Sequence, residues 1–535
     1  MRTPPRPTWQ ISADASISRH NQVFQQKETE ILNLFNNKHY ADATTLAEIL
    51  GFYAWMNHTG HYASPTLENT LLEIGRQTVP VAPKSKRPKK ARPSVLHVMT
   101  QAYAIGGHSR VVWRWMEQDD TRSHSLALTR TGAAVPQELV QQVGKSGGTI
   151  TELTGSHLAR ATALRELATG ADFIVLHTHS YDVLPLLAFA NPLGLPPVIL
   201  FNQANHLFWY GAQVANVITS FDETCLNSAV RERGIPRTHQ ALLPLPLTST
   251  PRSLSRPEAK QKLGLPADST FMLTIASDYK FHPLPDEPGF LDHHLPFVQN
   301  NPNVHHWVIG VEPSPYWSAA TLATHGRFRI FPPTRDIAIH QQAADIYLDS
   351  YPVGSPTSLL ESALYETPPV SLRMGSSELR TSDPALTEAW QQPADTTALK
   401  KYLGNLLGNP SDRLLKGRQT AAAIRSHHEG PRWQKSLEDI YKKAASTPRI
   451  TTLSNRQSPI SLTDRILVTV YANAGLTQPY AFYLAWGMKD LSQLRQLRAI
   501  ITEHPYKYRY FWASLVPPSL QPMLRRAIGF IKRRP

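Results

Sequence analysis

Residues 344–372 combine the residue types that bind phosphate and the hydroxyl groups of a ribose. Their pattern predicts a buried strand, a polar turn at 351–356, a helix from Thr357 and a second strand from Val370. A small-residue turn that opens a helix leaves unpaired backbone N–H groups at a positive dipole end, which suits phosphate. Glu361 lies one turn into the helix, where its carboxylate can accept hydrogen bonds from hydroxyls of the same ligand. The stretch therefore predicts a site for a diphosphate that carries a ribose.

Side chains of this stretch and one earlier lysine are the candidate ligands of the diphosphate: Lys280, Ser355, Thr357, Ser358 and Glu361. Lys280 ends an apolar strand, from which its ammonium group can reach a diphosphate as a point charge. Plain alternatives stay open for each of them. Lys280 can be a solvated loop lysine, Thr357 and Ser358 can be helix-capping residues, and Glu361 can be a surface position.

A second group of candidate residues lies in the first half of the chain. Gly106, Gly107 and His108 close the first strand-to-helix loop of a predicted sheet, where glycine permits close approach of the backbone to a ligand. A histidine has a near-neutral pKa that suits general-base work on an acceptor hydroxyl. His177 and His179 follow another strand, and side-chain alternation sends both to one side. We predict His108 and His179 as the catalytic residues.

Residues 202–210 follow the next strand, at the same edge of the predicted sheet. Asn205 and His206 are their candidate contacts to an acceptor or a sugar. The aromatic residues at 208–210 either stack on that ligand or pack the interdomain surface. The His177/His179 pair lacks an identifiable third ligand, so no metal site is predicted.

Composition limits the class of protein. A chain of 535 residues is too long for one ordinary core and predicts two similar domains with appendages. The single cysteine, Cys225, excludes an intramolecular disulfide and fits a reducing compartment. The sequence contains no apolar run of about 18 residues and no signal-peptide core, which predicts a cytoplasmic protein.

The 55 Lys and Arg residues exceed the 41 Asp and Glu residues, which gives a net charge of +14. Basic clusters lie at 84–92 and 525–534, and nucleic acid, anionic lipid or plain solvation can each explain them. Nucleic acid is the least favoured of these partners, because no nucleic-acid motif accompanies the clusters. Residues 520–532 have the pattern either of an anchor at the inner face of an anionic membrane or of an amphipathic docking helix.

Strand and helix patterns alternate from residue 94 onward, which predicts an α/β protein with two doubly wound parallel sheets. A proline-rich hinge at 241–256 joins the two sheets and leaves a cleft between them. The predicted organisation is disorder at 1–20, a helical module at 21–80, a basic proline-rich linker at 81–93, Rossmann-like domains at 94–245 and 255–445, and a helical module at 461–535.

Over roughly residues 94–445 the pair of domains resembles the GT-B fold of nucleotide-sugar glycosyltransferases. Glu361 followed six residues later by Thr367 and Pro368 is similar to the ribose-binding glutamate of a retaining family that has a second glutamate eight residues earlier. This chain has Val353 at that place. Residues 354–367 also resemble the turn and helix of inverting O-GlcNAc transferase-like enzymes, with a spacing that differs by one residue.

Further likenesses concern Lys280 and the two histidines. Residues 277–280 (SDYK) followed by Pro283 are similar to the strand end where the inverting enzymes place a donor-phosphate lysine. His108 resembles in placement the active-site histidine of several inverting GT-B enzymes, and His179 resembles the histidine that contacts the donor sugar in retaining ones. The choice between inversion and retention stays open, and the candidate base favours inversion.

The resemblance implies a glycosyltransferase that moves a hexosyl or N-acetylhexosaminyl group from a UDP- or GDP-sugar to a hydroxyl of a glycan, lipid or protein. It implies that no metal or other cofactor is needed. Gly106, Gly107 and the five ligands named above would hold the donor, and domain closure would bring His108 and His179 to its anomeric carbon. Two alternatives remain, a non-catalytic GT-B-like binding or scaffold protein and a nucleotide-sugar epimerase.

Overall fold

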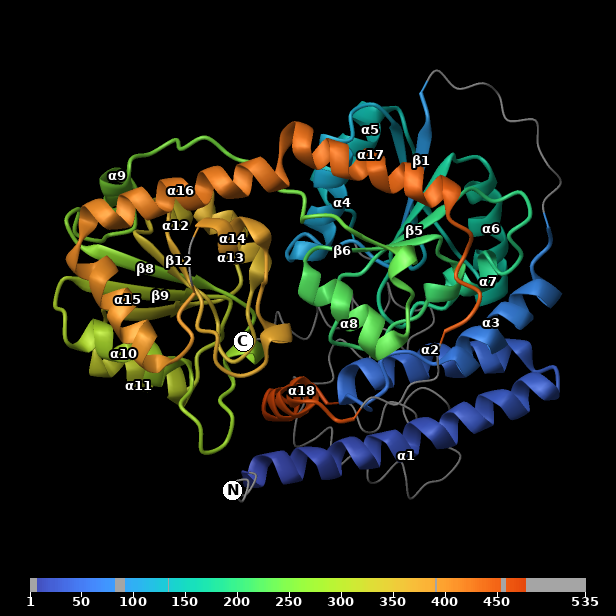
Figure 1. The fold of residues 1–535 in the computed structure, drawn as a ribbon, viewed down its shortest axis with the longest axis horizontal. Coiled ribbons are helices and arrows are strands. Elements are labelled where there is room, and N and C mark those ends of the chain that lie inside the picture. The colour runs from blue at the N-terminus through green and yellow to red at the C-terminus, as the bar shows by residue number, and fades with distance from the viewer. Residues whose placement is uncertain (1–6, 82–91, 133, 390–391, 454–458, 478–535) are drawn as a thin grey trace, which may run out of the picture.

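Two parallel β-sheets and the helices that cover them form the body of the protein (Figure 1). The computed structural model describes residues 7–132, 134–389, 392–453 and 459–477, apart from residues 82–91. The first sheet has the strand order β3-β2-β1-β4-β5-β6-β7 and the second the order β10-β9-β8-β11-β12. Neighbouring strands are parallel in both sheets, which confirms the predicted pair of doubly wound domains.

The strands of the first sheet are β1 (Ser94–Met99), β2 (Ser123–Leu128), β3 (Ile150–Glu152), β4 (Phe173–His177), β5 (Val198–Phe201), β6 (Val217–Ser220) and β7 (Gln240–Leu242). Those of the second are β8 (Thr270–Ile275), β9 (Val304–Ile309), β10 (Phe328–Phe331), β11 (Ile346–Leu348) and β12 (Pro369–Val370). Every residue of β1 is buried, because helices cover both faces of the sheet. β7 lies partly within the stretch predicted as hinge.

The helices of the first domain are α4 (Gly107–Gln118), α5 (Gln137–Ser146), α6 (His157–Thr169), α7 (Leu184–Ala188) and α8 (Glu223–Arg233). Those of the second are α9 (Arg256–Lys262), α10 (Phe290–Gln299), α11 (Pro315–Ala323), α12 (Ala338–Ala343), α13 (Pro356–Ala363), α14 (Pro384–Ala389), α15 (Thr396–Gly408) and α16 (Pro410–His428). Helix α17 (Gly430–Ser446) then returns along the top of Figure 1 to the first domain. This gives the chain the GT-B arrangement.

The returning helix α17 is fixed to α4 by buried polar contacts. Trp115 Nε1 donates to the hydroxyl of Tyr441 at 3.2 Å, and that hydroxyl donates to Asp119 Oδ2 at 2.9 Å. Trp433 is fully buried and meets Trp115 edge to face, with 6.0 Å between ring centroids. The end of the second domain is therefore part of the core of the first.

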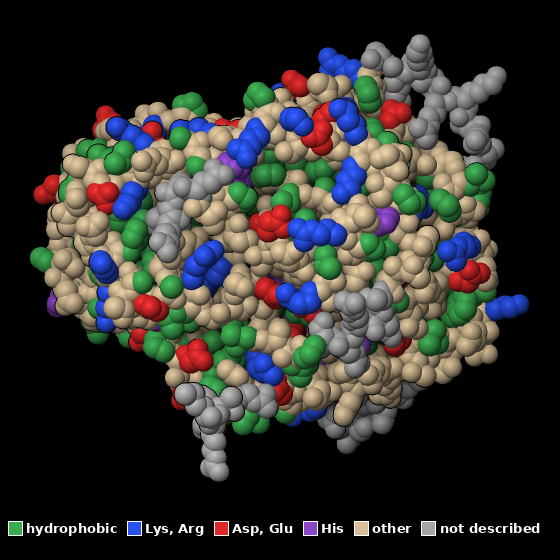
Figure 2. Space-filling view, viewed as in Figure 1, with side chains coloured by type: hydrophobic (Ala, Val, Ile, Leu, Met, Phe, Trp, Pro, Cys, Tyr) green, Lys and Arg blue, Asp and Glu red, His purple; other side chains and the backbone are tan. Residues whose placement is uncertain are grey.

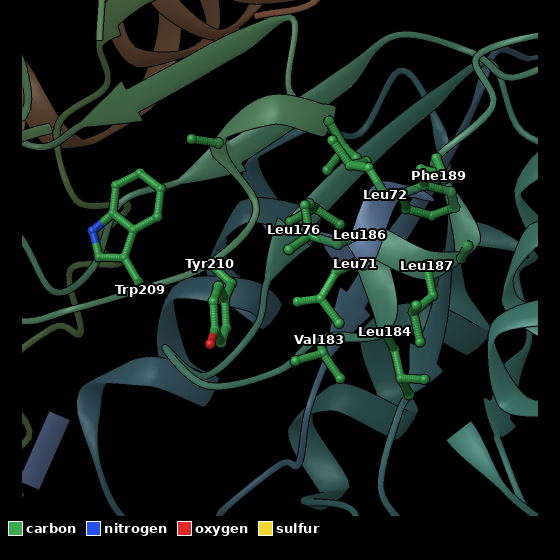
Figure 3. Packing of buried hydrophobic residues seen from close by; sticks show 14 of the residues in the cluster. Leu71, Leu72, Leu176, Val183, Leu184, Leu186, Leu187, Phe189, Trp209 and Tyr210 are labelled. Carbon is green, nitrogen blue, oxygen red and sulfur yellow. The ribbon is translucent and has the colours of Figure 1, made fainter. Parts of the chain in front are cut away.

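The N-terminal module consists of α1 (Thr8–Asn36), α2 (Tyr40–Asn57) and α3 (Pro65–Thr78), which lie below the first domain in Figure 1. Helix α1 corrects the expected disorder of residues 1–20, because the chain is helical from Thr8 onward. Leu71 and Leu72 of α3 pack beside the leucines of α7 (Figure 3). The buried carboxylate of Glu68 accepts hydrogen bonds from three consecutive backbone N–H groups, at 211–213. The module thus shares one core with the first domain.

Helix α18 (Leu462–Asn473) joins that module to the second domain. The carboxylate of Asp464 lies 2.5 Å from His58 Nε2 and accepts a hydrogen bond from Tyr62 at 2.6 Å. On its other side, Tyr471 meets Tyr279 edge to face. None of the helices within the described residues has the length and apolar character needed to cross a membrane. The predicted anchor or docking helix at 520–532 lies outside the described residues.

Charged side chains of both signs are interspersed on the face shown in Figure 2. Blue Lys and Arg groups lie beside red Asp and Glu groups over both domains. This face therefore shows no continuous basic surface of the kind that tracks a nucleic-acid backbone.

Three buried histidines form a chain across β4, β1 and β2. His97 Nδ1 lies 3.1 Å from His177 Nε2, and His97 Nε2 lies 3.0 Å from His124 Nδ1. His124 Nε2 must donate to the carbonyl of Asp119, at 2.7 Å, because a carbonyl only accepts. The same tautomer follows for the other two rings, so each donates through Nε2. Burial lowers the pKa of all three histidines.

We expect the three hydrogen-bonded histidines to make the stability of the folded protein decrease at acidic pH. The pKa of each ring is below its unfolded value near 6.5, so the unfolded state takes up protons first as the pH falls. Stability from this source is fully present above about pH 6.5 and should decrease by about 1 kcal/mol per histidine at about pH 5.5. Denaturant titrations at both pH values measure it. A His97→Met variant should show a smaller pH difference, and an unchanged difference would contradict the assignment.

Candidate functional site

Asp349, at the end of β11, shapes the turn that sequence analysis singled out. Its Oδ1 accepts hydrogen bonds from the backbone N–H groups of Ser350, at 2.9 Å, and Ser355, at 2.8 Å. Its Oδ2 accepts one from the hydroxyl of Ser371 at 2.9 Å. The Ser355 N–H is therefore occupied by the protein. The N–H groups of the first turn of α13, which begins at Pro356, remain for a ligand.

Lys280 lies against this turn. Its ammonium group donates to the carbonyl of Gly354 at 2.8 Å and to the hydroxyl of Ser355 at 3.3 Å. Burial lowers the pKa of Lys280 to about 8, while the nearby Asp349 carboxylate partly opposes the shift. The lysine remains a cation at neutral pH, and it is held by contacts from a neighbouring strand end.

Glu361 is held by two arginines of the first domain. Arg110 Nη1 lies 2.6 Å from one carboxylate oxygen, and Arg114 Nη1 lies 2.7 Å from the other. Glu361 is only 7% exposed, so this is a largely desolvated interdomain contact. The sequence analysis did not identify either arginine. Their spacing of four residues, directly after the glycine loop, places them on one face of α4 and is the signal available in the sequence.

The glycine loop of the first domain touches the same helix start. A Cβ atom at Gly107 would lie 3.1 Å from the hydroxyl oxygen of Thr357. The neighbouring Gly106 has a φ of 120°, a conformation that side chains rarely adopt. Both predicted glycines and Thr357 are therefore brought together, where the N-termini of α4 and α13 meet.

His108, in the first turn of α4, has a fixed tautomer. Its Nε2 lies 2.7 Å from the backbone carbonyl of His177 and must donate to it. The Nδ1 atom then carries a lone pair and has no partner among the described residues. Burial lowers the pKa of His108 to about 4, so the ring is neutral at pH 7. A neutral ring with a free lone pair has the form that a general base requires.

His179 lies beside His108, with 5.4 Å between the ring centroids. Its ring stacks on Tyr103 at 5.8 Å, and its Nδ1 lies 3.1 Å from the hydroxyl of Tyr181. Burial lowers the pKa of His179 well below its ordinary value. The two predicted catalytic histidines are thus brought together. Tyr103, whose side chain is 42% exposed, joins them as an aromatic face that sequence analysis did not identify.

Asn205 and His206 are both on the first-domain side of the cleft, and they differ in role. The Asn205 carbonyl accepts a hydrogen bond from Arg233 at 2.9 Å. Burial, with a contribution from the positive charge of Lys280, lowers the pKa of His206 to about 3. A neutral His206 therefore lies near the lysine of the opposite domain.

Sequence analysis left open whether the aromatic residues at 208–210 stack on a ligand or pack between domains, and two of them pack. Phe208 is packed against Phe24, and the Tyr210 hydroxyl donates to the Ala47 carbonyl, so both join the first domain to the N-terminal module. The Trp209 side chain points away from Tyr210 (Figure 3) and lies under Arg233. Within the described residues, no group of three or more His, Cys, Asp or Glu side chains is placed to hold a metal ion.

No protein-family model and no curated protein sequence matches the chain. Similar solved structures include a mutant of the Thermobaculum terrenum O-GlcNAc transferase, at 15% identity over 82% of this chain and 84% of that one, with a TM-score of 0.48. The likeness concerns the fold. Anabaena HepE in complex with UDP and glucose is 10% identical over 66% of this chain and all of that one, with a TM-score of 0.49. At such similarity, the residues of this chain itself must carry a functional proposal.

We expect the Glu361→Gln variant to loosen the contact between the domains. The amide cannot balance two guanidinium groups, so the free energy of unfolding should fall by about 1–3 kcal/mol. Glu366→Gln is the matched control, because its ion pair with Arg418 is on the surface. Denaturant unfolding of both variants measures the difference. Equal stability of the two would show that the Glu361 contact does not hold the domains together.

Proposed function

We propose that the protein is a glycosyltransferase that moves a sugar from a nucleoside diphosphate donor to a hydroxyl of a glycan, lipid or protein. The observation that carries the proposal is the contact between Gly107 and Thr357. It brings the first turn of α4, which carries His108, to the first turn of α13, and Lys280 contacts the turn just before α13. This arrangement supports a general base and phosphate ligands that act on one substrate at the contact between the domains.

On the donor side, the first-turn N–H groups of α13 and the Thr357 and Ser358 hydroxyls bind the diphosphate, together with Lys280. The positive end of the helix and the ammonium group stabilise the charge that develops on the departing nucleotide. A metal ion is not required for this step, because Lys280 supplies the cation. UDP and GDP are both candidate nucleotides.

The ribose of the donor binds Glu361 in this proposal. Its carboxylate oxygens accept hydrogen bonds from Arg110 and Arg114. Donor binding therefore includes an exchange in which ribose hydroxyls take over part of the carboxylate. The two guanidinium groups then lie free beside the diphosphate, to which they are complementary in charge.

On the acceptor side, His108 Nδ1 accepts the proton of the attacking hydroxyl while His179 and Tyr103 border the sugar. A base on the acceptor favours inversion at the anomeric carbon, and the hydrophobic residue Val353 at the position of the retaining family's glutamate agrees with that choice. Asn205 and His206 complete the first-domain wall of the site.

We expect a His108→Gln variant to lose turnover by 100-fold or more, in line with a general base, while donor affinity stays the same. The assay is nucleotide release from a panel of UDP- and GDP-sugars, followed by the anomeric configuration of the product. His325→Asn, in an exposed loop of the second domain, is the control. Full activity of His108→Gln would exclude this base.

We expect kcat/KM to depend on pH through two groups. Activity should fall below about pH 4, where His108 becomes protonated, and above about pH 8, where Lys280 loses its charge. A Lys280→Arg variant, whose guanidinium stays charged, should move the alkaline limit upward. An alkaline limit that stays in place would assign it to another group.

The same panel separates the two alternatives. Nucleotide binding without transfer or hydrolysis would indicate a binding or scaffold protein, and an altered sugar still attached to its nucleotide would indicate an epimerase.

A further inference from the structure

Arg380 lies at the carboxyl end of the second sheet, in the segment that follows β12 and the single turn at Ser377–Leu379. Strands β8, β11 and β12 are neighbours, and each leads into part of the candidate donor site. Lys280 follows β8, the turn at 350–355 follows β11, and Arg380 follows β12. Ligands of parallel sheets bind at this edge.

The guanidinium group of Arg380 is fixed on one side. Nη1 donates to the carbonyl of Ser350 at 3.1 Å, and the group lies over the Tyr351 ring at 5.0 Å. A Cβ atom at Gly354 would lie 3.5 Å from the same Nη1. Gly354 also provides the carbonyl that binds Lys280, so the two cations flank one residue of the turn.

The other side of the group is without a partner. Arg380 is 6% exposed, yet neither its Nε nor its Nη2 has a hydrogen-bond partner within the described residues. These two nitrogens lie on the same edge of the planar group, which is the edge that binds two oxygens of one phosphate or carboxylate. In four other arginines of the described chain, the buried Nε alone lacks a partner: Arg122, Arg160, Arg165 and Arg233. Arg380 is distinguished by a complete free edge.

The charges around Arg380 also favour an anionic ligand. No carboxylate of the described residues comes within ion-pair distance of either Lys280 or Arg380, and the electrostatic influence of Asp349 reaches both. The buried carboxylate of Asp349 thus faces the buried Arg380 and the half-buried Lys280. A buried charge without compensation is destabilising, and an anionic ligand would supply the missing charge and two hydrogen-bond acceptors.

We propose that Arg380 is a donor-binding residue that holds the diphosphate through the Nε and Nη2 edge of its guanidinium group. The inference rests on the proposed function and adds to it a residue for the diphosphate, on the side of Gly354 opposite Lys280. The Tyr351 ring and the Ser350 carbonyl orient the group before the ligand arrives, which reduces the entropy lost on binding.

The test is calorimetric titration of the full chain with UDP, GDP, uridine and guanosine. Arg380→Lys keeps the charge and removes the two-nitrogen edge, so we expect it to weaken binding of the preferred diphosphate about 10-fold or more and to leave the matching nucleoside unchanged. Arg329→Lys, on an exposed edge-strand residue, is the control. Arg380→Met provides the same readout should the lysine variant fail to fold.

The outcomes separate the two proposals. If the unmodified protein binds neither diphosphate, the proposed function fails and this inference fails with it. If it binds one and Arg380→Lys binds it equally well, only the role of Arg380 is overturned. Equal loss of diphosphate and nucleoside affinity would also overturn it, because that result indicates a structural role in the turn.

Discussion

The contact of Glu361 with Arg110 and Arg114 is the interaction on which the candidate site depends. Through it, a helix of the second domain, α13, is joined by charge to a helix of the first, α4. Because the pair is largely buried, each partner needs the other, and separating them would leave uncompensated charges. This ion pair keeps Gly107 against Thr357. The distance from His108 to the proposed donor-binding residues depends on that contact. Arg110 and Arg114 are thus the counter-ions of the carboxylate that is proposed to bind the ribose.

Two further elements hold the same arrangement from outside the cleft. Helix α17 inserts Trp433 and Tyr441 into the core beside α4, and α18 is bonded to the N-terminal module through Asp464 while it packs on Tyr279. Tyr279 precedes Lys280, so the packing of α18 bears on the lysine that contacts the turn. Domain opening would have to bend around α17 and shift α18. Helix α18 and the N-terminal helical module therefore help to hold the two domains in place.

Much of the fold could be predicted because buried parallel strands leave long apolar runs, and prolines and glycines mark where these runs end. Lys280 and Ser355 were both predicted as ligands of one diphosphate, and the structure brings their side chains together. The sequence analysis did not identify Arg110, Arg114 or Arg380. From sequence alone, an arginine in a helix or loop cannot be distinguished from a solvated charge, because the surface that it contacts is unknown. Asp349 was read as the end of a strand, and its three hydrogen bonds depend on how the turn folds back. The helix at Thr8–Asn36 contradicts the expected disorder because its buried face is covered by distant segments, including α18.

The charged side chains of the candidate site do not balance one another. Two carboxylates, Glu361 and Asp349, face four cationic groups, which are Arg110, Arg114, Lys280 and Arg380. Two surplus positive charges therefore remain where the N-termini of α4 and α13 add partial positive charge of their own. Such a surplus favours a ligand of two or more negative charges. A nucleoside diphosphate has that charge, and it also carries the ribose hydroxyls that Glu361 can accept. In the proposed function, the residues that hold the domains together are therefore also those that bind the donor.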